Sequence, residues 1–188
     1  MSVHWDDYQP YESLRQGRPN DLLRREARQE YGHVMAARSD REQVLADLLR
    51  RNGVVLSWDD DGVQAVDDWF TRNVTRADDV PDRLAGRWYA VATDIGLFLG
   101  DLLIMRCPWL RWEFQTYLPR SLSYRWAVVV GFRVNNPKYC VEFRQDVAGW
   151  GQVVSGRRVR ESGHLLTRLH SAEFYASGVS PRPVEACW

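Results

Sequence analysis

The chain has 188 residues, of which 45% are hydrophobic and nine are Trp, which is enough apolar material for the core of one folded domain. This composition excludes a disordered or fibrous protein, and three widely spaced cysteines without a C-x-x-C pair exclude a disulfide framework and a zinc ribbon. The 25 basic and 25 acidic residues cancel, which argues against nucleic acid as the main partner.

Residues 1–19 mix aromatic residues with Pro and show no steady period, so we expect an irregular N-terminal arm that packs through its aromatic side chains. Apolar residues then recur at helical spacing to about Arg38. Ser39 to Glu42 has the S-x-x-E form of a capping box, and Asn52 begins a C-terminal stop signal. The sequence therefore predicts one helix, followed by a second helix or a kinked continuation.

The short apolar run over residues 54–56 predicts one buried strand, and a third helix follows over about residues 63–74. A fourth helix runs from Pro81, in its first turn, to about Met105. It is the most apolar helix and should be central, yet its apolar stretch is broken by Asp101 and is too short to cross a bilayer. Because no secretory signal precedes it, we expect a cytoplasmic protein without a membrane segment.

The fourth helix carries two acidic and two small residues whose spacing is informative. Asp94 and Asp101 lie seven residues apart on one face, where burial would raise their pKa values and prepare one for acid/base work. The simpler interpretation places them at a solvent-facing edge or in ion pairs with Arg residues from the sheet. Gly96 and Gly100 lie one turn apart, which allows another backbone to approach closely.

After residue 107 the apolar period changes from 3.6 to 2, which is typical of strands. Four strands are expected, over residues 110–118, 125–134, 139–144 and 150–154, joined as an antiparallel meander, and a last helix over residues 162–174. The predicted fold is α+β, with N-terminal helices packed on a C-terminal antiparallel sheet of about four strands and a final helix. The arm at 1–19, a single domain at 20–178 and a tail at 179–188 complete the organisation.

The charge is divided at the same boundary as the predicted helices and strands. Residues 1–105 have a net charge of −6, and residues 106–170 have a net charge of +7. An acidic run in the first half is a candidate docking surface for a basic protein, although such runs are usually solvated faces. It comprises Asp59, Asp60, Asp61, Asp67, Asp68, Asp78, Asp79 and Asp82.

The basic half is an alternative site, for nucleic acid or another anionic ligand, because Arg beside aromatic residues is typical of single-strand binders. Its candidate residues are Arg111, Arg125, Arg157, Arg158 and Arg160, supported by Trp109, Trp112, Trp126, Arg133 and Arg144. However, strand alternation places Trp112 on the same face as Leu110, which predicts an inward ring.

Motifs for chemistry are few. Residues 57–68 have oxygen ligands at alternate positions and Gly62 at the sixth, as in a calcium loop, but an Asp-rich helix N-terminus explains them better. A third hypothesis is a small hydrolase or transferase built on His164, His170 and Asp101. Separately, His170 and Glu173 could share a helical face and form an acid/base pair or a metal site with His33, although lone histidines are more often surface or core residues. Cys140 in an apolar strand favours inert burial. No known catalytic or cofactor-binding motif occurs, so no metal, cofactor or enzyme activity is predicted.

The pair Asp68-Trp69, followed by Gly96-Leu97-Phe98-Leu99-Gly100-Asp101 and a Trp-containing strand, resembles an uncharacterised actinobacterial domain with a G-x-[FY]-[LV]-G-[DE] signature. The resemblance covers about residues 40–155. Some small α+β domains of this kind are immunity or accessory proteins of bacterial toxin systems, so the resemblance implies binding to another protein and transfers no catalytic residue. The expected function is a non-enzymatic interaction module; the sequence is silent on oligomeric state.

Overall fold

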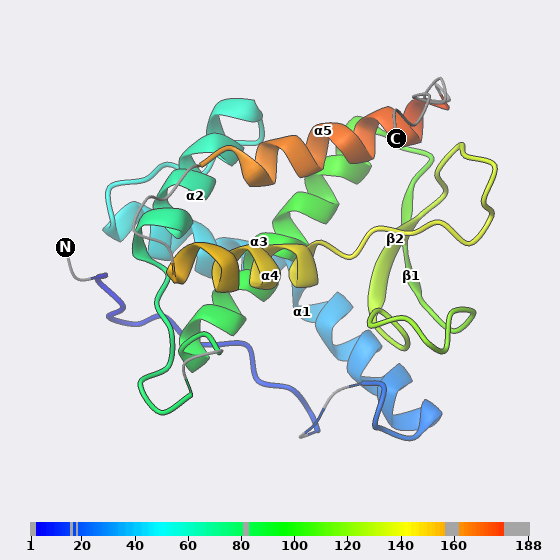
Figure 1. Ribbon diagram of the computed structural model, residues 1–188, viewed down its shortest axis with the longest axis horizontal. Coiled ribbons are helices and arrows are strands. Elements are labelled where there is room, and N and C mark those ends of the chain that lie inside the picture. Colours follow the sequence, from blue (N-terminus) through cyan, green and yellow to red (C-terminus); the bar gives the residue numbers. More distant parts are fainter. Residues whose placement is uncertain (1–2, 16, 18, 81–82, 157–161, 179–188) are drawn as a thin grey trace, which may run out of the picture.

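The computed structural model describes residues 3–15, 17, 19–80, 83–156 and 162–178. Within them the chain forms five helices and two short strands, and Figure 1 shows how they are arranged. The helices are α1 (Arg24–Arg51), α2 (Asp60–Asn73), α3 (Gly86–Arg106), α4 (Phe143–Ser155) and α5 (His164–Ser177), and the strands are β1 (Arg111–Phe114) and β2 (Ala127–Val130). The α+β class is confirmed, whereas the sheet of four strands is wrong.

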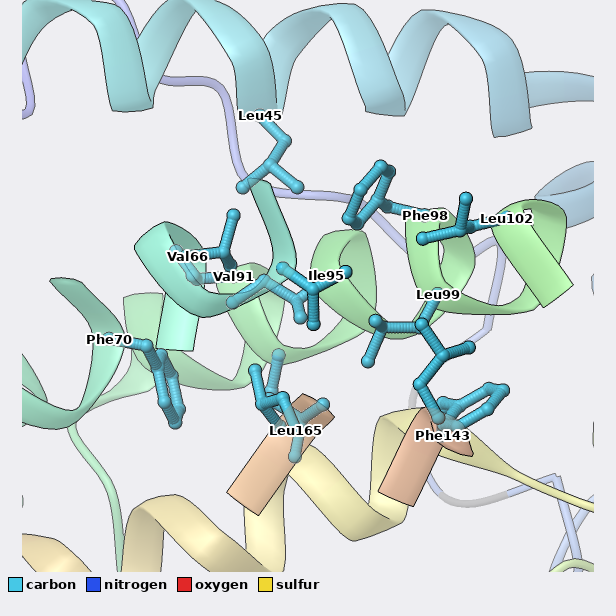
Figure 2. Packing of buried hydrophobic residues seen from close by; sticks show 14 of the residues in the cluster. Leu45, Val66, Phe70, Val91, Ile95, Phe98, Leu99, Leu102, Phe143 and Leu165 are labelled. Atoms are coloured by element: carbon cyan, nitrogen blue, oxygen red, sulfur yellow. The ribbon is translucent and has the colours of Figure 1, made fainter. Parts of the chain in front are cut away.

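Helix α3 forms the centre of the fold, as its composition predicted, because it is apolar around its whole circumference. Figure 2 shows Leu45 of α1 on one side of α3, and Phe143 of α4 and Leu165 of α5 on the opposite side. The expectation that this helix is too short to cross a bilayer is wrong, because α3 is long and apolar enough to do so, but 67% of its apolar window is buried inside the fold. That burial is typical of the core helix of a soluble domain.

Helix α1 continues through Ser39 to Glu42 without a break, so the predicted second helix does not exist. Arg41 in this stretch and Leu45 just after it are buried, and Arg41 is fixed to Asp94 of α3. These contacts with α3 outweigh the local tendency of Ser39 to start a new helix.

The predicted strand at residues 54–56 is also wrong. This segment links α1 to α2, and its Val55 side chain is 78% exposed. The Val54 amide donates to the Leu49 carbonyl at the end of α1 and makes no strand ladder. A short apolar run forms a strand only where a neighbouring strand can pair with it, and none lies beside this one within the part of the chain that the structure describes.

The strands predicted at residues 139–144 and 150–154 are replaced by α4. Only Val141 pairs with β2, through a single bridge to Val129. The buried residues Phe143, Val147, Gly151 and Val154 follow at helical spacing. Because glycines favour neither helix nor strand, the few residues around Trp150 do not distinguish a helix from a strand. Gly151 is needed in the helix because a Cβ there would lie 2.9 Å from Phe70.

The two strands pair antiparallel, with Arg111 opposite Val130 and Phe114 opposite Ala127. All four residues of β2 are buried, as expected for a central strand. Figure 1 shows the strands beside the helices, and the helices pack on one another rather than on a sheet. The predicted packing of helices on a sheet is therefore wrong.

Two glycines of α3 allow the close contacts that their spacing predicted. A Cβ on Gly96 would lie 2.6 Å from the backbone nitrogen of Arg144 in α4, and one on Gly100 would lie 2.2 Å from the ring of Trp112 in β1. Trp112 also donates its indole N–H to Asp101 at 2.7 Å. Its ring therefore points inward, as predicted, and is not a stacking platform.

The N-terminal arm packs through its aromatic residues, as expected. The Trp5 ring meets the edge of Trp88 with 5.0 Å between centroids, and Tyr8 is only 5% exposed. The arm therefore belongs to the main core. The predicted start of α3 at Pro81 lies outside the described residues, and the helix begins at Gly86. The predicted tail at residues 179–188 also lies outside them.

Candidate functional site

The acidic run does not form one surface. Asp59, Asp60 and Asp61 lie at the N-terminus of α2, whereas Asp78 and Asp79 follow its C-terminus. A helix of 14 residues is about 20 Å long, so the two groups lie at opposite ends of α2. Asp82 lies outside the described residues.

Asp67 is fully buried and cannot take part in docking, so its place in the predicted surface is wrong. Its carboxylate accepts hydrogen bonds from the backbone N–H groups of Gly163, at 2.7 Å, and Leu165, at 3.0 Å, where α5 begins. The burial of Asp67 could have been predicted from the sequence, because position 67 lies on the same helical face of α2 as Val63 and Phe70. The neighbouring Asp68 is partly exposed and accepts from Gln64 at 2.7 Å.

The calcium-like segment is a helix cap. The Asp59 carboxylate accepts from the Gly62 amide at 2.8 Å and from the Ser57 hydroxyl at 2.6 Å, and these bonds lower its pKa. Gly62 is already helical and lies against Ser57. Among the described residues, no three His, Cys, Asp or Glu side chains are arranged to hold a metal ion. The Asp59 side chain caps α2, in agreement with the interpretation of this segment as an Asp-rich helix N-terminus.

Asp60 instead joins a surface network of charges, which we call the Arg106 cluster. Arg106 donates to Asp60 and to Glu173 of α5, both at 2.8 Å, and the His170 ring lies 2.8 Å from the second oxygen of Asp60. Hydrogen bonds from Arg106 and His170 lower the pKa of Asp60. The cluster joins the start of α2, the end of α3 and the second half of α5.

Large exposed apolar side chains flank the Arg106 cluster. Trp58 is 42% exposed, Met105 is 53% exposed and Phe174 is 40% exposed, and each lies within two residues of a cluster member. Trp58 is held edge-on against Phe98 of α3. We call the cluster, these three residues and the exposed Asp59 and Asp61 the Trp58 surface. It combines aromatic, Met and Arg side chains, which are enriched in protein interfaces.

The residues of the third, catalytic hypothesis have separate partners. Asp101 accepts from Arg38 at 2.5 Å and from Trp112, whereas His170 meets Asp60. His164 stacks on Trp150 at 4.4 Å, and its burial lowers its pKa. The contacts therefore join each of these groups to different neighbours and not to one another, which gives the catalytic hypothesis no support.

Two further candidates from the sequence also have their own contacts. His33 lies 3.3 Å from the Glu12 carbonyl on the surface of α1. The half-buried Cys140 follows β2 in a loop, not in a strand, and burial raises the pKa of its thiol. A raised pKa disfavours the reactive thiolate, so inert burial remains the better interpretation of Cys140.

From the sequence, Asp94 is expected at a solvent-facing edge of its helix or in an ion pair with an Arg from the sheet. Both expectations are wrong. Asp94 is fully buried, and Arg41 of α1 binds its two oxygens at 2.8 and 2.6 Å. The Tyr8 hydroxyl donates to it at 2.7 Å. Burial raises the pKa of Asp94, and these hydrogen bonds oppose the shift. The carboxylate thus ties the arm and α1 to the central helix.

Glu42 is a second acidic group with an altered proton affinity. Burial and a hydrogen bond shared with Asp101 raise its pKa to about 8, and one of its oxygens is buried without a partner. The folded protein therefore keeps this proton up to about pH 8, whereas the unfolded chain loses it near the ordinary value of 4.5. Stability that comes from the protonated folded state must fall as the pH rises between these two values.

We expect the free energy of unfolding to decrease from pH 5 to pH 8, and Glu42→Gln to make that decrease smaller and to be the more stable protein at about pH 8. Urea unfolding at several pH values measures this. Asp40→Asn, at an exposed position two residues earlier, is the control. An unchanged pH dependence in Glu42→Gln would contradict the assignment.

The predicted basic surface is also divided. Arg111 pairs with Glu113 on β1, at one end of the ladder, whereas Arg125 precedes β2 at the other end. Arg157, Arg158 and Arg160 lie outside the described residues. Arg144 is buried and binds Glu142 at 2.8 Å. Arg125 and Arg144 are brought together at a groove, which the spacing in the sequence did not reveal.

No protein-family model matches this chain, and neither the curated proteins nor the solved structures contain a significant match. The resemblance to an actinobacterial domain therefore stays a prediction, and the function has to be argued from the side chains themselves.

Proposed function

We propose that this protein is a non-enzymatic interaction module whose Trp58 surface binds a basic, partly apolar surface of another protein. The observation that supports this most is the Arg106 cluster, which joins the chain segments that carry the exposed side chains of Trp58, Met105 and Phe174. Exposed aromatic side chains at a charged cluster are the composition of binding hot spots. An immunity-type inhibitor of a toxin is one form that such a module can take.

The charge of the Trp58 surface supports a basic partner. Asp59, Asp60, Asp61 and Glu173 are opposed by Arg106 alone when His170 is neutral, which leaves three negative charges in excess. Complementary charge accelerates association and excludes acidic partners, while the apolar side chains supply most of the binding energy. Asp61 is exposed at the start of α2, where it is accessible to a partner.

The experiment compares two charge reversals from the original acidic run. Proteins captured from the native cells are purified and titrated against the wild type, Asp61→Lys and Asp79→Lys. Both positions are exposed, but only Asp61 lies at the Trp58 surface. We expect Asp61→Lys to weaken binding about ten-fold and added salt to weaken it further, with Asp79→Lys close to wild type.

Trp58→Ala is expected to weaken the same complex about thirty-fold, because a central aromatic residue contributes about 2 kcal/mol or more to an interface. Circular dichroism checks that the variant stays folded, since Trp58 also contacts Phe98. A partner that binds both Trp58 surface variants as tightly as the wild type would exclude this surface, as would the absence of any saturable partner.

A further inference from the structure

A groove lies at the other end of α3 from the Trp58 surface. A cavity of about 480 Å³ is lined by Tyr89, Leu122, Trp126, Arg144, Gly149 and Gln152, among others. It adjoins a smaller cavity of about 100 Å³ beneath the N-terminal arm, and the two share Thr93, Trp126 and Arg144. We call the two together the Trp126 groove. Its volume is in the range that small-molecule sites occupy.

Arg125 lines the smaller cavity and has unsatisfied hydrogen-bonding capacity. One terminal nitrogen of its guanidinium donates to the Leu22 carbonyl, but its Nε is buried without a partner. No carboxylate pairs with this guanidinium among the described residues. Its backbone has a φ of 62°, which is unusual for a residue other than Gly and is a strain that often marks binding sites.

Trp126 and Arg144 form a fixed wall between the two cavities. The Arg144 guanidinium lies 4.3 Å from the centroid of the Trp126 ring, and the indole N–H donates to Asn20 at 3.0 Å. Glu142, itself buried, holds the Nε of Arg144 at 2.8 Å. The ring is therefore prevented from rotating, so it presents a rigid apolar surface to a planar group.

Polar groups of the larger cavity can orient a ligand. The Tyr89 hydroxyl accepts from the Gln152 side chain at 3.2 Å and from the Leu84 amide at 3.4 Å. Both bonds use its oxygen as acceptor, so among the described residues its own hydrogen is left to be donated. Leu122, 69% exposed, supplies an apolar edge.

The charge of the groove selects the class of ligand. The ionisable side chains lining it are Arg15, Arg125, Arg144 and Glu30, together with the tyrosines. Glu30 already accepts from the Tyr11 hydroxyl at 2.7 Å and the Leu14 amide at 2.8 Å, and Glu142 balances Arg144. The groove therefore has an excess of positive charge and unused N–H donors, which an anionic group satisfies.

We propose that the Trp126 groove binds a small organic anion, whose planar apolar part packs between Trp126 and Leu122 and whose carboxylate or phosphate group reaches Arg125 and Arg144. This site is separate from the proposed protein surface. Tyr89 and Met105 lie 16 residues apart on α3, which corresponds to about 24 Å. The two proposals can therefore fail independently.

Naphthoate and its neutral analogue naphthamide test the proposal, because they share a ring system and differ in charge. Binding is followed by the nine indole N–H signals in proton–nitrogen NMR spectra, with Trp126 assigned by Trp126→Phe. We expect naphthoate to shift the Trp126 signal saturably at millimolar concentration. Naphthamide should bind more weakly than naphthoate by a factor of about ten or more. Naphthyl phosphate in place of naphthoate distinguishes a phosphate from a carboxylate site.

Two variants locate the site. Gly149 lines the groove, and a Cβ there meets nothing within 4 Å, so we expect Gly149→Phe to place its ring in the groove and block it. Gly32 of α1 has the same open surroundings, which makes Gly32→Phe the matched control. Arg125→Gln removes the guanidinium and is expected to weaken naphthoate about ten-fold while leaving naphthamide unchanged.

Loss of naphthoate binding in Gly149→Phe, with binding retained in Gly32→Phe, supports the proposal. It is overturned if naphthoate causes no saturable shift of Trp126, if naphthamide binds equally well, or if Gly149→Phe binds like the wild type. If Arg125→Gln loses the folded arm, seen in the Trp5 indole signal, Gly149→Phe decides alone, since its Cβ meets no atom within 4 Å.

Discussion

Asp94→Ala is expected to lower the free energy of unfolding by about 3–5 kcal/mol, because it leaves the Arg41 guanidinium buried without its partner. The same change removes the acceptor of the Tyr8 hydroxyl and loosens the arm from α3. Urea unfolding at neutral pH measures the loss. In this pair, as in Arg144–Glu142, both side chains are nine-tenths or more buried, so its removal should be among the most damaging substitutions.

Two controls separate the ion pair from general effects of a substitution. Asp47→Ala removes an exposed pair with Arg50 and should cost less than about 1 kcal/mol. Replacing both partners together, as Asp94→Leu with Arg41→Met, should recover much of the stability lost in Asp94→Ala, since no buried charge is then left alone. A loss in Asp94→Ala no greater than in Asp47→Ala would contradict the role assigned to Asp94.

Gly96→Ala is the second substitution with a large expected effect. The added Cβ would lie 2.6 Å from the backbone nitrogen and 2.7 Å from the Cα of Arg144, and backbone atoms cannot rotate away as a side-chain end does. Helices α3 and α4 would have to separate, which should cost about 1–3 kcal/mol or more. The Arg144 contacts that shape the Trp126 groove would be displaced with them.

Gly149→Ala, in α4, is the matched control for Gly96→Ala. Nothing lies within 4 Å of its added Cβ, so it should stabilise the protein by about 0.5–1 kcal/mol through the better helix propensity of Ala. The two substitutions are chemically identical and should have opposite signs in the same unfolding experiment. A destabilisation of equal size at both positions would show that close contact is not the cause.

Much of the helical framework could be predicted from the sequence, because the spacing of apolar residues is a local property. Apolar residues recur every three or four positions in α2, α3 and α5. The central, buried position of α3 was expected because it is the most apolar helix. The inward ring of Trp112 followed from strand alternation in the same way. These features depend on neighbours within a few residues.

Helix α4 was missed although Phe143, Val147, Gly151 and Val154 have helical spacing. Its two glycines lower helix propensity, and only contact with Phe70 shows why Gly151 is there. The local pattern was therefore ambiguous, and packing against α2 and α3 decided it. The formation of α4 also limits the sheet, because residues that are helical in α4 cannot form further strands.

The sequence by itself determined that most of α1, α2, α3 and α5 is helical, where the acidic and basic residues occur, and which helix is central. Only the tertiary structure decided what each charge does. It buried Asp67 under α5 and Asp94 against Arg41, grouped Asp60 with Arg106 from 46 residues away, and placed Arg125 beside Arg144. A side chain's charge is local, but its partners and exposure depend on long-range contacts that no short window of sequence contains.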